Sequence, residues 1–262
     1  MNRYFIITKK AMLIFAAICL ALVLAVLIFS TSDILVETAA GQRKLPIYST
    51  HQTEKRISLS FDAAWGAEDT QQLIDIFDKY NIKVTFFVVG EWVDKFPEMV
   101  KLLHEAGHEI QNHSDSHPHL TNLSKSEIQT ELEQCNTKIH SITGIRPTLM
   151  RPPYGDYDNK VLETAQGIGM KTIQWSVDSL DWKDLSAEQI TDRVLKATEP
   201  GSIVLFHNAA KHTPQALPKI IESLQADGYQ LVPISSLIYQ SNYTIDHTGK
   251  QIPNSLQQKP LS

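Results

Sequence analysis

The sequence predicts an α/β fold: a distorted (β/α) barrel of about seven parallel strands, preceded by one N-terminal transmembrane helix. Short, β-branched apolar runs alternate with helix-period segments along residues 55–240, which is the pattern of a parallel, right-handed βα assembly. Polar residues suited to catalysis stand at the ends of several of these runs, and in a barrel such ends converge on one mouth. An uncharged apolar run long enough to cross a bilayer, about 20 residues, precedes the domain.

Residues 11–30 form the predicted anchor. Basic residues precede this apolar run and acidic residues follow it. The positive-inside tendency therefore places residues 1–10 in the cytoplasm and the rest of the chain outside, as a single-pass protein of the cell membrane. The alternative is a cleaved signal peptide with a small-residue site in "ETAA", although the apolar run is longer than the usual signal core.

The domain is expected between a polar linker, residues 31–54, and a polar, disordered tail, residues 241–262. Helices are expected over 68–81, 94–107 and 124–144, and the last of these begins with a capping box, Ser124 with Glu127. Strands are expected over 56–63, 83–90, 108–114, 148–155, 171–177, 202–208 and 229–235.

Composition excludes several classes of function. The formal net charge of −5 is mild and spread along the chain, so we expect no nucleic-acid partner. The sequence contains no GxGxxG and no GxxxxGK[ST] motif, which removes the usual basis for nucleotide binding and for an open doubly wound sheet. The two cysteines form no CxxC pair, so thiolate zinc and dithiol redox chemistry are not expected.

Two histidines in "HSDSHPH" have the spacing of a metal site. His113 and His117 follow a strand at positions i and i+4, which can bring two imidazoles to one metal ion. Alone this spacing is a weak signal, and two surface histidines are the alternative. Asp62 closes the first strand, in "SFDAAWG", and is a candidate general base.

Three later strands also end in reactive side chains. Arg151 precedes two prolines that hold the backbone extended, so it is suited to pair with a carboxylate, or else is a solvated residue of a structural turn. Asp181 could orient a histidine, as could Asp178, and the Trp182 indole could wall a sugar-sized pocket. His207 follows an apolar run and is a candidate acid or base, or a core histidine.

Taken together, "SFDAAWG", "HSDSHPH", "RPPYG", "DSLDW" and "IVLFH" resemble the five motifs of the polysaccharide deacetylase (NodB homology) family, carbohydrate esterase family 4. The resemblance covers roughly residues 55–240 and is strongest to the membrane-anchored, PdaB-type sporulation deacetylases of spore-forming bacteria. It implies a distorted (β/α) barrel. It also implies a hydrolase that removes N-acetyl groups from amino sugars of a cell-wall polysaccharide, namely peptidoglycan, spore cortex or a chitin-like glycan.

The resemblance also implies a role for each site residue. Asp62 would be the base, held ionised by Arg151, and His207 would protonate the leaving amine, tuned by Asp181. His113 and His117 would bind a divalent metal, with zinc expected before cobalt or manganese. The substrate side would comprise the backbone N–H of Tyr154 at the oxyanion, and Trp182 and Leu205 around the acetyl group.

One position departs from the family pattern. The family usually has a second aspartate after its catalytic one, as a third metal ligand, and here that residue is Ala63. Three outcomes are open: a weakened metal site, a reaction with little help from metal, or a catalytically inactive glycan-binding protein. Glycosidic cleavage by paired carboxylates, Asp62 with Asp178 or Asp181, is a further alternative.

Overall fold

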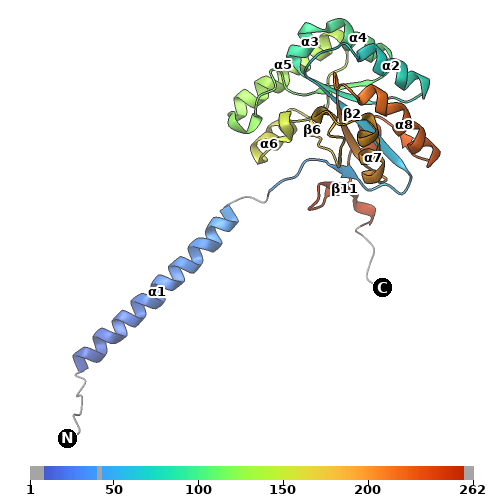
Figure 1. The fold of residues 1–262 in the computed structure, drawn as a ribbon. Coiled ribbons are helices and arrows are strands. Elements are labelled where there is room, and N and C mark those ends of the chain that lie inside the picture. Colours follow the sequence, from blue (N-terminus) through green and yellow to red (C-terminus); the bar gives the residue numbers. More distant parts are fainter. Residues whose placement is uncertain (1–8, 40–42, 257–262) are drawn as a thin grey trace. The chain divides into compact units, whose positions relative to one another are not determined.

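The computed structural model describes residues 9–39 and 43–256, and within residues 9–39 the side chains of residue 11 and of 27–39 are not described. The chain divides into two units, Met1–Arg43 and Lys44–Ser262. The first contains one helix, α1 (Lys9–Ala39), and the second contains all the strands (Figure 1). In the part of the chain that the structure describes, no helix combines the length and the apolarity that a membrane span needs. The anchor over residues 11–30 stays a prediction.

The second unit is built on a curled, all-parallel sheet in the order β6-β5-β4-β3-β2-β8-β7. A further short strand, β9 (Gln230–Leu231), pairs with the start of β2. The sheet strands are β2 (Arg56–Ala63), β3 (Thr85–Val88), β4 (Glu109–Asn112), β5 (Leu149–Met150), β6 (Lys171–Thr172), β7 (Val177–Asp178) and β8 (Ile203–His207). This agrees with the expected distorted barrel of about seven strands.

Helices cover the outside of the sheet (Figure 1). They are α2 (Thr70–Lys79), α3 (Gly90–Lys95), α4 (Pro97–Glu105), α5 (Lys125–Thr143), α6 (Asn159–Gly167), α7 (Ala187–Ala197), α8 (Thr213–Ala226) and α9 (Ile234–Leu237). Short 3-10 turns lie at η1 (Leu120–Asn122), η2 (Pro153–Gly155), η3 (Asp181–Lys183) and η4 (Asn254–Leu256). The expected capping box is present, since the Ser124 side chain accepts from the Glu127 N–H and the Glu127 side chain accepts from the Ser124 N–H.

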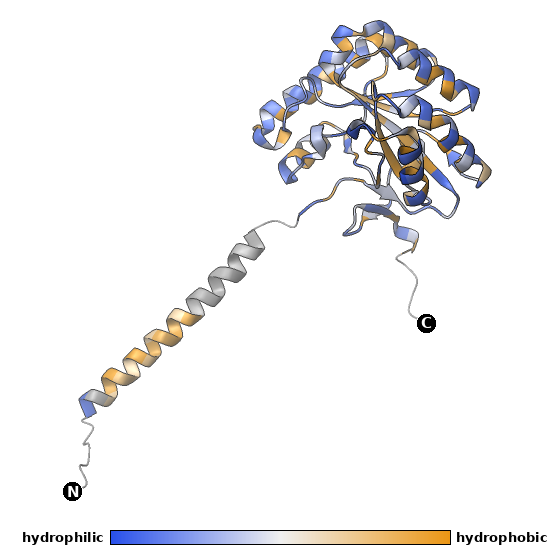
Figure 2. Ribbon diagram, viewed as in Figure 1, coloured by the Kyte–Doolittle hydropathy of each residue, from blue (hydrophilic) through white to orange (hydrophobic). Residues whose placement is uncertain are grey.

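The core follows the alternation of each strand. Odd-numbered residues of β2 face the helices, and the Phe61 ring stacks on Phe86 and Phe206 of the neighbouring strands at 5.1 and 5.3 Å. Apolar residues accordingly concentrate along the central strands (Figure 2). The even-numbered residues Ser58, Ser60 and Asp62 face the other way, into the curl of the sheet, where the polar groups of the site collect.

Four predicted segments differ in the structure. The strand expected over 148–155 is shortened to Leu149–Met150, and Pro153–Gly155 form the turn η2 instead. The strand expected over 171–177 is split into β6 and β7, which lie at opposite edges of the sheet. The backbone between them bonds elsewhere: the Gln174 N–H donates to the Ile47 carbonyl, and the Ser176 N–H donates to the Ile203 carbonyl. The helix expected over 94–107 is interrupted before Pro97, and the strand over 229–235 stops before Pro233, since proline has no N–H to donate.

The expected linker and tail are also partly ordered. Ile47 is buried, and β1 (Ser49–Thr50) pairs with β11 (Lys250–Pro253), which in turn pairs with β10 (Tyr243–Ile245). The predictions of a linker up to residue 54 and of a disordered tail from 241 were therefore wrong for residues 44–54 and 241–256. Residues 257–262 lie outside the described residues.

Candidate active site

The site is centred on the two middle strands of the sheet. Asp62 of β2 and His207 of β8 are direct partners in the parallel register, so their side chains leave the same face at the carboxyl end of both strands. Ser60 and Leu205, two residues earlier on each strand, are also partners and lie on the same face. The convergence that the sequence predicted for strand ends is present at this place.

Asp62 is held by a buried arginine. The Arg151 Nη1 group donates to Asp62 Oδ1 at 2.7 Å, and Nη2 donates to Ser60 Oγ at 2.8 Å. The guanidinium is fully buried and lies over the Phe87 ring, 4.2 Å from its centroid. Burial alone would raise the pKa of Asp62, but the positive charge of Arg151 outweighs it, so that the pKa is lowered and the carboxylate is ionised. This is the arrangement a general base requires.

His207 is held by a second buried carboxylate. Its Nδ1 lies 2.8 Å from Asp181 Oδ1, and its backbone N–H donates to Asp181 Oδ2 at 2.9 Å. Thr213 Oγ1 also donates to Asp181 Oδ2, at 2.7 Å. Burial would lower the pKa of His207, but the hydrogen bond and the charge of Asp181 more than offset it and the pKa is raised. A histidine with a raised pKa and a partly exposed ring is suited to donate a proton.

His113 faces Asp62 with its second nitrogen. Its Nδ1 lies 2.8 Å from the Arg151 carbonyl oxygen, and because a carbonyl can only accept, Nδ1 carries the proton. Burial lowers the pKa of His113, so the ring is neutral and Nε2 presents a lone pair 3.5 Å from Asp62 Oδ2. Two acceptors facing each other in a buried site call for a cation, a proton or a water molecule between them.

His117 is the second imidazole beside Asp62. Its ring centroid lies 4.9 Å from that of His113. Burial and the neighbouring His113 lower the pKa of His117 to about 4, so it is neutral at physiological pH. Its Nδ1 is buried and finds no hydrogen-bond partner within residues 9–39 and 43–256. A neutral imidazole with an unused nitrogen beside His113 and Asp62 is suited to bind a metal ion.

The loop that carries these histidines is held from α5. Its backbone is left-handed at Ser114 and again at His117, with φ of 65° and 58°. The Glu131 carboxylate accepts from the backbone N–H groups of Asp115 and Ser116, both at 2.9 Å, and from the Ser116 hydroxyl at 2.7 Å. Sequence analysis missed Glu131, because nothing in the helical pattern distinguishes it from a solvated glutamate.

Comparisons with known proteins identify the family of this chain. The family model described as polysaccharide deacetylase matches residues 49–173. The peptidoglycan-N-acetylglucosamine deacetylase of Bacillus cereus is 34% identical over 198 residues, which are 74% of this chain and 72% of that protein.

The chain belongs to the polysaccharide deacetylase family.

Two further relatives bear on its function. The peptidoglycan-N-acetylglucosamine deacetylase PgdA of Listeria monocytogenes is 38% identical over 194 residues, and the chain spans only 41% of that relative's length. A solved structure from Bacillus anthracis, titled a pseudoenzyme of the CE4 family, has a TM-score of 0.72 at 32% identity, with 79% of this chain and 70% of that one covered. A mutant of that pseudoenzyme is titled as having restored enzymatic activity.

His113 and His117 are the residues that the family resemblance assigns to a metal in this member of the polysaccharide deacetylase family. His113 Nε2 and the buried nitrogen of His117 fit a divalent cation by type and by protonation state. Ala63 is only 1% exposed and lies in the apolar cluster on the helix side of the sheet. No group of three potential metal ligands forms among the described residues. The chain therefore presents a two-histidine donor set beside Asp62, without the third carboxylate.

The predicted substrate-side residues lie at the same mouth. Tyr154 is left-handed, with φ of 60°, and its exposed ring stacks on His119 at 4.2 Å and contacts the His117 ring at 4.6 Å. Trp182 lies in η3 next to Asp181 and is 58% exposed. Leu205 is buried on the face that carries His207. The role of these three residues around the acetyl group stays a prediction of the family resemblance.

The two other carboxylates named for glycosidic cleavage have different surroundings. Asp178 Oδ1 accepts from the Leu180 N–H within its own turn. Asp181 is buried, and its oxygens accept from His207 and Thr213. Asp181 is therefore engaged in holding His207, and glycosidic cleavage by Asp62 with Asp178 or Asp181 stays an untested alternative.

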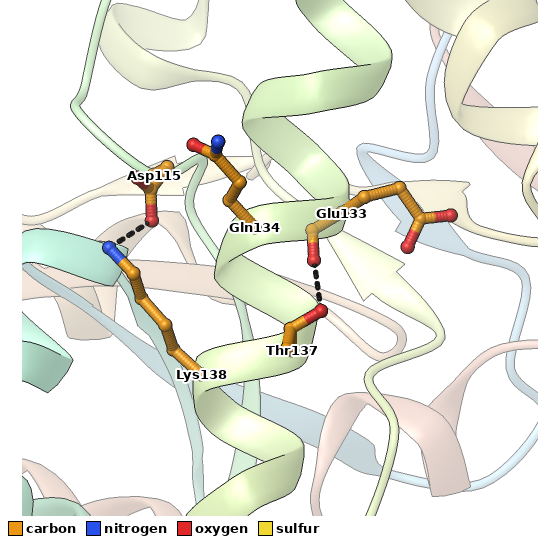
Figure 3. Close-up of a pocket in the computed structure, with 5 residues that line it drawn as sticks. All are labelled: Asp115, Glu133, Gln134, Thr137 and Lys138. Atoms are coloured by element: carbon orange, nitrogen blue, oxygen red, sulfur yellow. Dashed lines mark hydrogen bonds and ion pairs between the residues drawn. The ribbon is translucent and has the colours of Figure 1, made fainter.

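A separate hollow of about 470 Å³ lies against α5, and none of the predicted site residues line it (Figure 3). Its lining comprises Asp115, Glu133, Gln134, Thr137 and Lys138. Lys138 forms ion pairs with Asp115 and with Asp94, both at 2.7 Å. Since Asp115 belongs to the histidine loop, these ion pairs brace that loop from its outer side.

Proposed function

We propose that this protein hydrolyses the N-acetyl amide of amino sugars in a cell-wall polysaccharide, with peptidoglycan as the substrate class. The observation that carries the proposal is the pairing of Arg151 with Asp62 and of Asp181 with His207 on neighbouring strands. One pair keeps a base ionised and the other keeps an acid protonated, and both side chains reach the same face of the sheet. The names of the relatives support peptidoglycan as the substrate.

The reaction uses these groups in order. Asp62 takes a proton from the attacking water, which adds to the acetyl carbonyl. The backbone N–H of Tyr154 stabilises the oxyanion, and His207 gives its proton to the departing amine. Positioned acids and bases of this kind each contribute about 10²- to 10⁴-fold in rate. Trp182 and Leu205 enclose the acetyl methyl group.

A divalent metal at His113 and His117 is part of the proposal, with zinc expected before cobalt or manganese. When bound, it polarises the acetyl carbonyl and makes the attacking water more acidic. The two histidines would hold it, and the ionised Asp62 beside them adds the negative charge that favours binding. Since Ala63 provides no carboxylate, the affinity is weaker than that of a three-ligand site.

The membrane anchor also belongs to the proposal. The uncharged run over 11–30 and the basic residues before it support a single span, with the domain outside the cytoplasm at the cell surface or in the forespore envelope. A sporulation role rests on the family resemblance. Protease added outside intact protoplasts should cleave the domain, and recovery of the full chain in the soluble fraction after lysis would reject the anchor.

A second candidate function is glycan binding without turnover. The observation that favours it is Ala63, together with the similarity to a pseudoenzyme of the same family. The two candidates differ in a single measurement, because only a deacetylase releases acetate from a glycan that both would bind.

The decisive experiment measures acetate release from peptidoglycan and from chito-oligosaccharides, with chelator and with added zinc, cobalt or manganese. Asp62→Asn and His207→Ala should each abolish release. Asp62→Asn leaves the buried Arg151 guanidinium without its carboxylate, which costs about 3–5 kcal/mol, so the fold of each variant is checked by circular dichroism. Asp178→Asn is the matched control: this strand-end carboxylate accepts from the Leu180 N–H of its own turn and its charge is the smallest contribution to the pKa of His207, so the variant should keep most of its activity. Wild-type protein that binds glycan but releases no acetate under any condition would establish the binding function instead.

A further inference from the structure

The exposed aromatic side chains of the second unit gather at the mouth of the site. Among the described residues from 44 to 256, the large apolar side chains that are more than half exposed are Trp65, Ile145, Tyr154, Trp182 and Leu256. All three aromatic ones follow the carboxyl ends of sheet strands, namely β2, β5 and β7. The two aliphatic ones lie elsewhere, after α5 and in η4. Tyr154 and Trp182 have roles at the reacting sugar, whereas Trp65 has none.

Trp65 lies next to His117, on the side away from Asp62. Asp62 contacts His113, His113 contacts His117, and the His117 ring contacts Trp65 at a centroid distance of 6.1 Å. Asp62 and His113 are buried, with 7% and 2% of their surface exposed, His117 is half-buried, and Trp65 is 70% exposed. Trp65 therefore borders the reaction centre without touching its acid or its base.

The backbone under Trp65 is fixed from two sides. Its carbonyl accepts from Trp92 Nε1 at 3.0 Å and from Asn208 Nδ2 at 2.9 Å, and the next carbonyl, of Gly66, accepts from the same two groups. A Cβ at Gly66 would lie 2.9 Å from the Ala209 Cβ, so a larger residue would have to displace the neighbouring loop. Two buried side chains thus hold a loop whose indole is left in water. This is the state of a preorganised binding surface, since little ordering is required when a ligand arrives.

We propose that Trp65 is the platform of a second sugar subsite, next to the subsite of the sugar that reacts. The ligand is a β-1,4-linked chain of N-acetylated amino sugars, and the apolar C–H face of one pyranose ring stacks on the indole. An aromatic side chain with few rotatable bonds provides a large contact area at a small entropic cost. The class of ligand in this inference rests on the proposed function. Such a subsite would make the protein bind polymers more tightly than single sugars.

The test compares binding of tetra-N-acetylchitotetraose and of a peptidoglycan tetrasaccharide with binding of free N-acetylglucosamine. Calorimetry is carried out on the full-length chain with Asp62→Asn, so that no sugar is consumed. Trp65→Ala in this background should weaken binding of whichever tetrasaccharide binds by about tenfold, which is about 1.4 kcal/mol. Trp65→Tyr should fall between, and monosaccharide binding should not change. Ile145→Ala removes an apolar side chain of similar exposure away from the mouth, and should leave all the affinities unchanged.

Three results would overturn the subsite. They are unchanged tetrasaccharide binding in Trp65→Ala, an equal loss for the monosaccharide and the tetrasaccharide, and the absence of tetrasaccharide binding by the parent protein. Acetate release separates this inference from the proposed function. If tetrasaccharide binding depends on Trp65 but the protein with Asp62 intact releases no acetate, the deacetylase is rejected and the subsite stands. If that protein releases acetate but Trp65→Ala does not change tetrasaccharide binding, the subsite is rejected and the deacetylase stands.

Discussion

Restoring a carboxylate at Ala63 is the perturbation that bears most directly on the site. Ala63 is the last residue of β2 and pairs with Val88 in the parallel register. Strand alternation turns its Cβ away from Asp62, toward the apolar cluster behind the sheet. An aspartate here has two environments available: the apolar cluster, or the end of the strand, where it can reach His113 and His117.

The structure gives opposite expectations with and without metal. Without metal, the new side chain at this 1% exposed position loses hydration, which costs about 1–3 kcal/mol of folding stability. With metal, a third, anionic ligand should tighten binding. A hundredfold excess of zinc over its dissociation constant would then contribute about 2.7 kcal/mol. For a domain of this size, 1 kcal/mol corresponds to about 2–4 °C, so zinc should raise the melting temperature of Ala63→Asp by roughly 5–10 °C.

The assay is thermal unfolding in chelator and in a zinc series, with the wild type and Ala63→Asn as controls. Asparagine has the shape of aspartate without its charge, so it should show the loss of stability and little of the gain from zinc. Acetate release measured in the same series reports whether the variant that binds zinc more tightly is also the more active enzyme. An equal zinc response in the aspartate and asparagine variants would refute the reasoning, because the gain would then owe nothing to an anionic ligand.

Three further changes test the groups around the site. Asp181→Asn removes the hydrogen-bonded charge that raises the pKa of His207. Since the acid must be protonated, the alkaline limb of the pH–rate profile should move to lower pH, and an unmoved alkaline limb would contradict this role. Glu131→Gln weakens three hydrogen bonds to the histidine loop and should lower the free energy of unfolding in urea by about 1–3 kcal/mol. Glu133→Gln on the same helix is the control: it loses a surface ion pair with Arg146 and should lower that free energy by less than about 1 kcal/mol. Burial lowers the pKa of His108 to about 4, below its value in the unfolded chain, so the protein loses free energy of unfolding as the pH falls from about 6.5 to 4. His108→Phe should reduce this acid-dependent loss by about 2–4 kcal/mol, and unfolding curves with the same pH dependence in both proteins would count against it.

The sequence by itself determined the parts that depend on local pattern. The alternating run 56–63 is a strand in the structure, and its last polar residue, Asp62, lies at the centre of the site. The capping box at Ser124 marks the start of α5 correctly. Each of these signals needs only neighbouring residues and one periodicity, so it can be read without knowing what packs against the segment.

Only the tertiary structure decided what depends on distant partners. Residues 171–177 have strand composition, yet they divide between two sheet edges, because the segment around Ile47 takes the hydrogen bonds between them. Lys250–Pro253 form a strand because β11 pairs with β1, about 200 residues earlier in the chain. Glu131 is functional only because α5 packs beside the histidine loop. The direction of Ala63, toward apolar side chains from several elements, is likewise set by packing, since a strand residue's surroundings depend on which elements the fold brings to each face of the sheet.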